Sequence, residues 1–126
     1  MAIERVGQPR ARRGGTGTHA EPVLAETVQR LVDTFRPEQI YLFGSRARGD
    51  AQTDSDYDIM VVVPASDLPP HHRAQLAHRV LGGMRVAADI LVWTRQEFDH
   101  FRPVPGSLAA TILREGRLLY DARSQE

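Results

Sequence analysis

The run Tyr57–Val63 (YDIMVVV) restricts the fold of this chain more than any other segment. It is rich in β-branched residues, and Pro64 closes it, which is typical of a strand. Its nearly continuous apolar end predicts a strand that is buried on both faces. An acidic residue, Asp58, interrupts this apolar strand close to its start.

Helical and strand patterns alternate along the rest of the chain. Apolar residues at three- and four-residue spacing predict an amphipathic helix over Glu21–Phe35, and a short apolar run predicts a strand over Gln39–Phe43. The remaining predicted elements are a helix over 71–81, a strand over 86–93, a short segment around 97–101, a helix over 107–113 and an apolar run over 118–120. This order predicts an α/β (α+β) fold, a small mixed β-sheet flanked by helices.

The length of 126 residues suits one compact domain, which we place at residues 21–122. Residues 1–20 are rich in arginine and glycine and predict a flexible N-terminal arm, and residues 123–126 form a C-terminal tail. No apolar run approaches the ~20 residues of a membrane span, and no secretory signal is present. The sequence therefore predicts a cytoplasmic protein without a membrane partner.

Composition narrows the chemistry. Without cysteine there is no thiolate site, so a metal ion would have to bind carboxylates or imidazoles, which favours Mg²⁺ or Mn²⁺. The formal net charge is zero, which gives no strong field for polyanions. Direct nucleic-acid binding is not expected, although the arginine-rich arm leaves that role open.

A glycine-serine pair marks the first candidate site. Gly44 and Ser45 follow a predicted strand and precede a predicted turn of helix, where backbone N–H groups can bind a phosphate. Arg46 and Arg48 flank this turn and could contact a triphosphate. The alternatives are ordinary helix capping by the serine and solvent-exposed positions for the arginines.

Three acidic residues on strands form the second candidate site. Asp56 and Asp58 are two residues apart, so their carboxylates project to one side with Cα atoms roughly 6.5 to 7 Å apart, while Tyr57 points to the core. Asp89 interrupts the strand over 86–93 in the same way, and a third acid on a neighbouring strand would complete a metal site. The alternatives are turn chemistry for Asp54 and Asp56 and a solvent-facing position for Asp89.

Other residues favour structural roles. His71, His72 and His78 lie on a predicted helix, where their spacing favours exposed positions over a zinc site. Trp93 could stack on a base or ribose, but a single tryptophan is more often part of the core.

The run GSRARGDAQTDSDYDI resembles the signature of the DNA polymerase beta-like nucleotidyltransferase superfamily, a glycine-serine pair followed by a ten-residue spacer and Asp-x-Asp. The resemblance covers residues 21–120 and is greatest to the minimal nucleotidyltransferase (MNT) group. It implies that Gly44 and Ser45 hold the triphosphate. It also implies that Asp56 and Asp58 bind Mg²⁺ and that Asp89 assists them and activates the attacking hydroxyl.

The same resemblance implies an activity and a partner. Stand-alone members of the MNT group are often antitoxins of HEPN-domain RNase toxins, and some transfer AMP from ATP to a tyrosine of the toxin. The chain is therefore expected to use ATP and to modify a HEPN-type toxin. The alternatives are transfer to a small molecule or an RNA end, and a non-catalytic module that neutralises a partner by contact alone.

Overall fold

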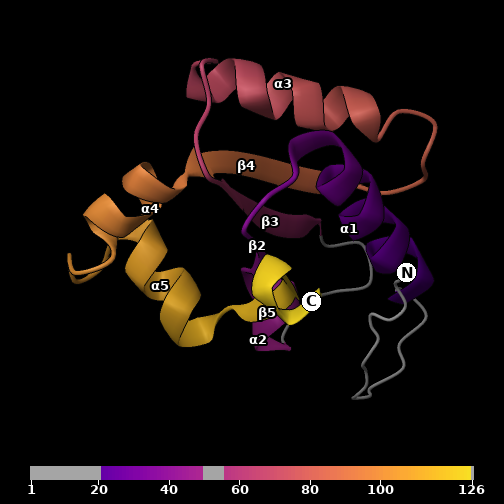
Figure 1. The fold of residues 1–126 in the computed structure, drawn as a ribbon. Coiled ribbons are helices and arrows are strands. Elements are labelled where there is room, and N and C mark those ends of the chain that lie inside the picture. Colours follow the sequence, from indigo (N-terminus) through magenta and orange to yellow (C-terminus); the bar gives the residue numbers. More distant parts are fainter. Residues whose placement is uncertain (1–20, 50–55, 126) are drawn as a thin grey trace.

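A mixed four-stranded sheet forms the centre of the computed structural model, which describes residues 21–49 and 56–125 (Figure 1). The strand order is β4-β3-β2-β5. β3 pairs with β2 in antiparallel and with β4 in parallel orientation, and β2 also pairs antiparallel with β5. The predicted mixed sheet is thus confirmed, with strands β2 Gln39–Phe43, β3 Tyr57–Val63, β4 Ala88–Thr94 and β5 Arg117–Asp121.

Helices cover both faces of this sheet. The helices are α1 Glu21–Phe35, α2 Ser45–Arg48, α3 Pro70–Val80, α4 Arg95–Phe101 and α5 Leu108–Glu115, and a 3-10 helix, η2 Ala122–Gln125, follows β5. Figure 1 shows α1 and α3 on one side of the strands and α4 with α5 on the other. Each pair of helices covers a separate hydrophobic core.

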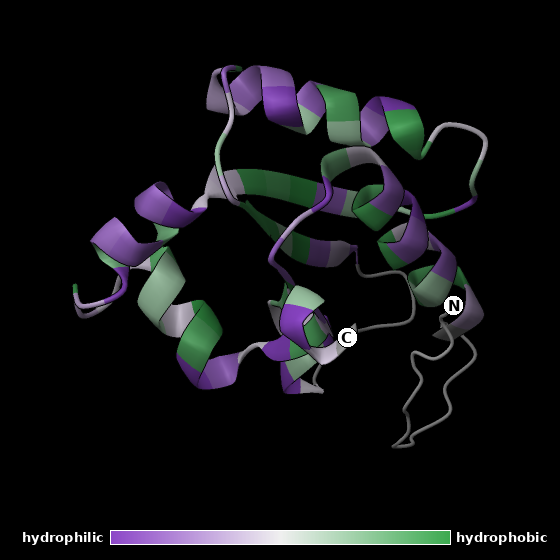
Figure 2. Ribbon diagram, viewed as in Figure 1, coloured by the Kyte–Doolittle hydropathy of each residue, from purple (hydrophilic) through white to green (hydrophobic). Residues whose placement is uncertain are grey.

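The alternating side chains of β3 divide between the two cores. Tyr57, Ile59 and Val61 join the core under α1 and α3, whereas Met60 and Val62 join the core under α4 and α5. Five of the seven β3 residues, from Ile59 onward, are at most 3 % exposed. The prediction of a strand buried on both faces is confirmed, and Figure 2 shows the apolar β3 and β4 between helices with one polar side.

Local sequence signals set the ends of the elements. The Ser107 hydroxyl accepts a hydrogen bond from the Ala110 backbone N–H at 3.1 Å and so begins α5, as predicted. The segment around 97–101 is helical, because Thr94 and Glu97 form a reciprocal capping box that begins α4. β4 begins at Ala88 and not at residue 86, because its partner β3 begins at Tyr57, the residue paired with Ala88.

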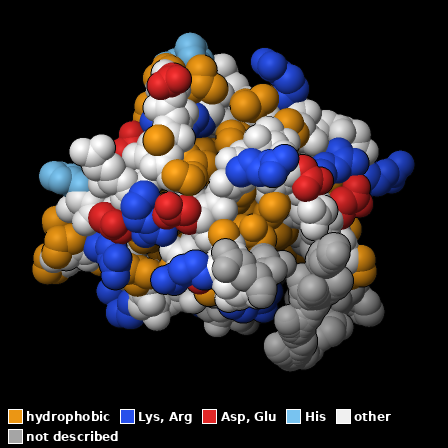
Figure 3. Space-filling model, in the orientation of Figure 1, with side chains coloured by type: hydrophobic (Ala, Val, Ile, Leu, Met, Phe, Trp, Pro, Cys, Tyr) orange, Lys and Arg blue, Asp and Glu red, His pale blue; other side chains and the backbone are white. Residues whose placement is uncertain are grey.

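The surface carries charges of both signs. On the face in Figure 3, arginine side chains lie among aspartate and glutamate side chains, in keeping with the net charge of zero. Across residues 21–49 and 56–125, no helix combines the length and the apolar character that crossing a membrane requires.

Candidate active site

Asp58 and Asp89 lie side by side on neighbouring strands. The parallel register pairs Asp58 of β3 directly with Asp89 of β4, and paired residues on adjacent strands share a face at a strand separation of about 4.8 Å. Both carboxylates project from the face that α4 and α5 cover elsewhere. At this end of the strands Asp58 is half-buried and Asp89 is exposed.

The acids act on one another electrostatically. The pKa of Asp58 is raised above its usual range, first by burial and then by the negative charges of Asp89 and Asp56. Arg48 acts in the opposite direction and lowers this pKa. Asp56, directly before β3, is exposed. The three predicted acids therefore lie near enough for the charges of Asp56 and Asp89 to act on Asp58.

The glycine-serine turn begins in contact with Asp58. Phe43, the last residue of β2, is paired with Asp58, so Gly44 follows at the same end of the sheet. Gly44 has φ 76°, and a Cβ atom on it would overlap the carboxylate of Asp58. Only glycine fits this position without strain.

A single turn of helix follows this glycine. The backbone N–H groups of Ala47 and Arg48 both donate to the Gly44 carbonyl at 3.1 Å, and α2 ends at Gly49 in the left-handed conformation. The predicted sequence of strand, turn and short helix is confirmed. Phosphate binding by Gly44 and Ser45 stays a prediction.

The two arginines of α2 have different surroundings. The guanidinium carbon of Arg46 lies 4.3 Å from the ring centroid of Tyr57, whose side chain belongs to the α1 and α3 core. Arg48 is exposed, and its charge reaches Asp58. The sequence predicted either a triphosphate contact or a solvent-exposed position for each arginine, and it held no signal for the contact between Arg46 and Tyr57.

The donor atoms of the three acids suit a divalent cation. Carboxylate oxygens are the ligands that Mg²⁺ and Mn²⁺ prefer. Among the residues that the structure describes, no three His, Cys, Asp or Glu side chains are grouped closely enough to hold a metal ion. Metal binding by Asp56, Asp58 and Asp89 fits the donor chemistry and stays a prediction.

Other predicted candidates lie away from these acids. Trp93 packs at the opposite end of β4 against Phe98 and Phe101, with ring centroids 6.4 and 5.9 Å away, so it belongs to the core. The three histidines of α3, His71, His72 and His78, are exposed, as predicted. Asp54 lies outside the described residues.

A buried arginine was not predicted from the sequence. Arg73 of α3 is 4 % exposed. Its guanidinium donates to the carbonyl of Val92 at 2.8 Å and to both carboxylate oxygens of Glu97 at 2.8 and 3.1 Å. The available signal was helical spacing, since Arg73 lies four residues before the fully buried Ala77 on one face of α3.

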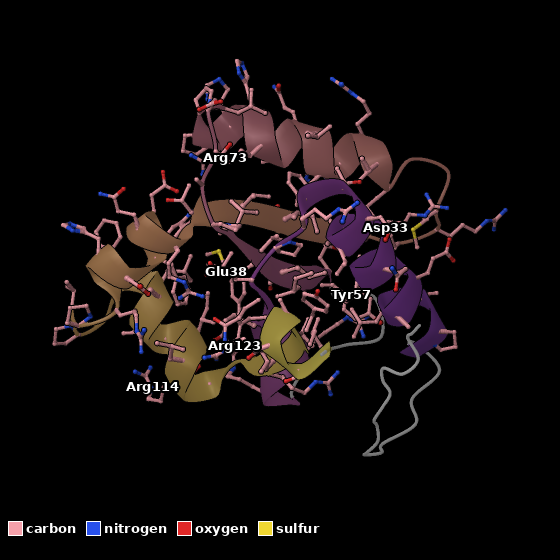
Figure 4. The ribbon with its side chains drawn as sticks, in the orientation of Figure 1. Asp33, Glu38, Tyr57, Arg73, Arg114 and Arg123 are labelled. Atoms are coloured by element: carbon pink, nitrogen blue, oxygen red, sulfur yellow. The ribbon has the colours of Figure 1, made fainter. Side chains whose placement is uncertain are left out.

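A cavity of about 550 Å³ lies at the other end of the sheet and not beside the acids. Its lining includes Glu38, Tyr41, Arg95 and Arg123, of which Figure 4 labels Glu38 and Arg123. The Arg95 guanidinium donates to Glu38 at 2.8 Å and to Asp99 at 3.0 Å, so its charge is compensated within the protein. None of the predicted site residues lines this cavity.

The glycine-serine turn beside paired acids agrees with the sequence comparison. Residues 26–125 match the family "Polymerase beta, Nucleotidyltransferase". The chain belongs to this nucleotidyltransferase family. It is also 31 % identical over 102 residues to a candidate protein adenylyltransferase of Methanocaldococcus jannaschii, a match that covers 79 % of this chain and 97 % of the relative.

Solved structures show the same fold. A candidate nucleotidyltransferase from Sulfolobus solfataricus superposes with a TM-score of 0.58 at 23 % identity, covering 88 % of this chain and 96 % of that chain. A mutant of the toxin–antitoxin pair MntA–HpeT superposes with a TM-score of 0.56 at 24 % identity, covering 80 % and 74 %. These likenesses confirm the expected polymerase beta-like nucleotidyltransferase fold.

Proposed function

We propose that this nucleotidyltransferase transfers AMP from ATP to a hydroxyl group of a protein, a tyrosine of a HEPN-type RNase toxin, and so acts as its antitoxin. The observation that carries the proposal is the direct pairing of Asp58 with Asp89 beside the Gly44 turn. It places the glycine-serine turn beside a group of carboxylates, and phosphoryl chemistry with divalent metals uses such carboxylates to hold the ions.

Each group in the site has a role in this reaction. Gly44 and Ser45 hold the triphosphate, and Asp56, Asp58 and Asp89 would hold Mg²⁺. When bound, Mg²⁺ neutralises phosphate charge and polarises the oxygens around it. The acceptor oxygen bonds to the α-phosphorus as the bond from that phosphorus to the bridging oxygen breaks. Pyrophosphate leaves with the electron pair, and Asp89, which is exposed, accepts the hydroxyl proton.

Two observations support a protein as the acceptor. The relative in M. jannaschii is described as a candidate protein adenylyltransferase. The exposed carboxylates at the end of the strands are accessible to a hydroxyl on another protein.

A labelling experiment tests this function. The purified protein is incubated with Mg²⁺ and ATP labelled at the α-phosphate in host cell lysate, and the protein, RNA and small-molecule fractions are separated. Wild type is expected to label a discrete protein band, and Asp56→Asn and Asp58→Asn are expected to lose this label. ATP labelled at the γ-phosphate should add no label to this band that depends on the wild-type protein, because nucleotidyl transfer releases that phosphate with pyrophosphate.

Asp67→Asn is the matched control, because Asp67 is exposed and lies outside the site. It should label the same band as wild type. Label in RNA or in small molecules would replace the protein acceptor by one of those classes. Without metal-dependent transfer to any fraction, a module that binds its partner by contact alone would replace the enzyme.

A further inference from the structure

The α2 segment is held from both sides by two successive residues of β3. Gly44, at the start of the turn, lies against the carboxylate of Asp58. Arg46, two residues later, lies over the ring of Tyr57 at 4.3 Å. Because neighbouring residues of a strand point to opposite faces, Asp58 and Tyr57 contact the segment from opposite sides of the sheet.

Burial in the core fixes the position of the Tyr57 ring, on which Arg46 of α2 rests. Its side chain is 7 % exposed and belongs to the core under α1 and α3, and Figure 4 shows Tyr57 at this end of the sheet, beside α1. Ala47, the next residue of α2, packs against the same core. An arginine over an aromatic face is attracted by the ring quadrupole, and more so where water is excluded. Together these contacts attach α2 to the α1 side of the sheet.

We propose that Tyr57 is a positioning residue for the nucleotide: through Arg46 it fixes α2, and with it Ser45 and Arg48, relative to Asp56 and Asp58. This inference rests on the proposed function and gives the two arginines of α2 different roles. Arg46 anchors α2 to the core, whereas Arg48 is exposed and its charge acts on Asp58. Tyr57, between the two acids in sequence, thus joins the metal-binding strand to the phosphate-binding turn.

The geometry decides between anchoring and direct phosphate contact for Arg46. Its guanidinium is stacked on a side chain of the α1 and α3 core, whereas Asp58 and its partner Asp89 belong to the other face. Stacking on an aromatic ring orients the guanidinium but does not neutralise its charge. Loss of the ring therefore leaves Arg46 charged but no longer fixed in position.

Isothermal titration with ATP and Mg²⁺ tests the proposal on the full chain. Tyr57→Leu removes the ring and should weaken ATP binding about threefold to tenfold, whereas Tyr57→Phe keeps the ring and should bind within about twofold of wild type. Arg46→Met should match Tyr57→Leu, and the double variant should be no weaker than either single variant, because each breaks the same contact.

Tyr41→Leu is the matched control, because Tyr41 is a buried tyrosine at 9 % exposure in the other core. It should lose stability but bind ATP as wild type does. Arg46→Met keeps the proposal testable should Tyr57→Leu fail to fold, because no residue of α2 is buried.

The outcomes separate this proposal from the proposed function. Tight ATP binding by wild type together with unchanged binding by Tyr57→Leu overturns the positioning role and leaves the enzyme intact. A loss from Arg46→Met far beyond that from Tyr57→Leu, or an additive double variant, shows that Arg46 contacts the nucleotide itself and also overturns it. A wild type that binds no ATP in the presence of Mg²⁺ overturns both proposals.

Discussion

The surroundings at the two ends of the paired strands β3 and β4 shift the pKa of a carboxylate in opposite directions. At the start of the strands, Asp58 faces Asp89, and negative neighbours and burial raise the pKa of Asp58. Directly after β4, Glu97 accepts two hydrogen bonds from the guanidinium of Arg73, and this contact lowers the pKa of Glu97. Of the acids at the two ends of these strands, Asp58 is thus disfavoured as an anion by its surroundings, whereas Glu97, in α4, is favoured.

This difference separates a site for binding from a site for stability. The Glu97 carboxylate also accepts a hydrogen bond from the Thr94 backbone N–H at 2.8 Å, so it joins α3, β4 and α4. Grouped acids such as Asp58 and Asp89 destabilise a fold unless a cation compensates them. Such a cost is expected where a ligand supplies the missing positive charge.

Removal of Arg73 should have the largest effect on stability. Arg73→Met leaves the Val92 carbonyl without its donor and Glu97 without its cation, and should lower the free energy of unfolding by about 3 kcal/mol or more. Urea denaturation measures this value. Arg30→Met is the control, because Arg30 also binds backbone carbonyls and a glutamate but is 38 % exposed, and it should cost far less.

An alanine at Gly44 should have the next largest effect. The positive φ strains any other residue, and the new Cβ would overlap the Asp58 carboxylate, so Gly44→Ala should cost about 1–3 kcal/mol. Gly49→Ala is a matched control with φ 86° and open space around its Cβ. Equal losses from both variants in urea denaturation would show that the contact with Asp58 adds nothing.

Neutralising Asp58 should leave stability unchanged or raise it slightly. Asp58→Asn removes a charge that Asp89 and Asp56 oppose, so the free energy of unfolding should stay equal or rise by up to about 1 kcal/mol. Added Mg²⁺ should stabilise wild type and not this variant. A marked loss of stability, seen in urea denaturation beside the exposed control Asp67→Asn, would mean that Asp58 is structural.

The sequence was sufficient to predict the strands and the faces of their side chains, because both depend on periodicity. Alternation along β3 predicted that Tyr57 points to the core and Asp58 away from it, and the apolar runs located the strands. It also predicted that Asp89 lies on a strand. Local patterns report the face on which a side chain lies, so these predictions needed no knowledge of the whole fold.

Contacts between distant segments could not be predicted in this way. The register of Asp58 against Asp89 depends on the sheet order, and the start of β4 at Ala88 depends on where β3 begins. The stacking of Arg46 on Tyr57 and the burial of Arg73 depend on tertiary packing that places residues far apart in sequence against one another. The spacing of arginines along a helix does not distinguish side chains that lie in solvent from side chains that make such contacts.

Lowering the pH should reduce the free energy of unfolding by a small amount through protonation of Glu97. Because its pKa in the folded protein lies below that of the unfolded chain, Glu97 stabilises the fold above its unfolded pKa. This contribution decreases as the pH falls through the folded pKa. The pKa values of Asp99 and Asp121 are lowered too, so the wild-type curve alone cannot isolate Glu97.

The difference between wild type and Glu97→Gln isolates this carboxylate. Urea denaturation from about pH 7 to about pH 3 should show wild type more stable at neutral pH and the difference shrinking toward the acid end. Glutamine retains the size and one acceptor oxygen, so the shrinking part reports charge alone. A difference that stays constant with pH would attribute the Arg73 contact to hydrogen bonding rather than to charge, and the contrast between the two ends of the strands would then not be electrostatic.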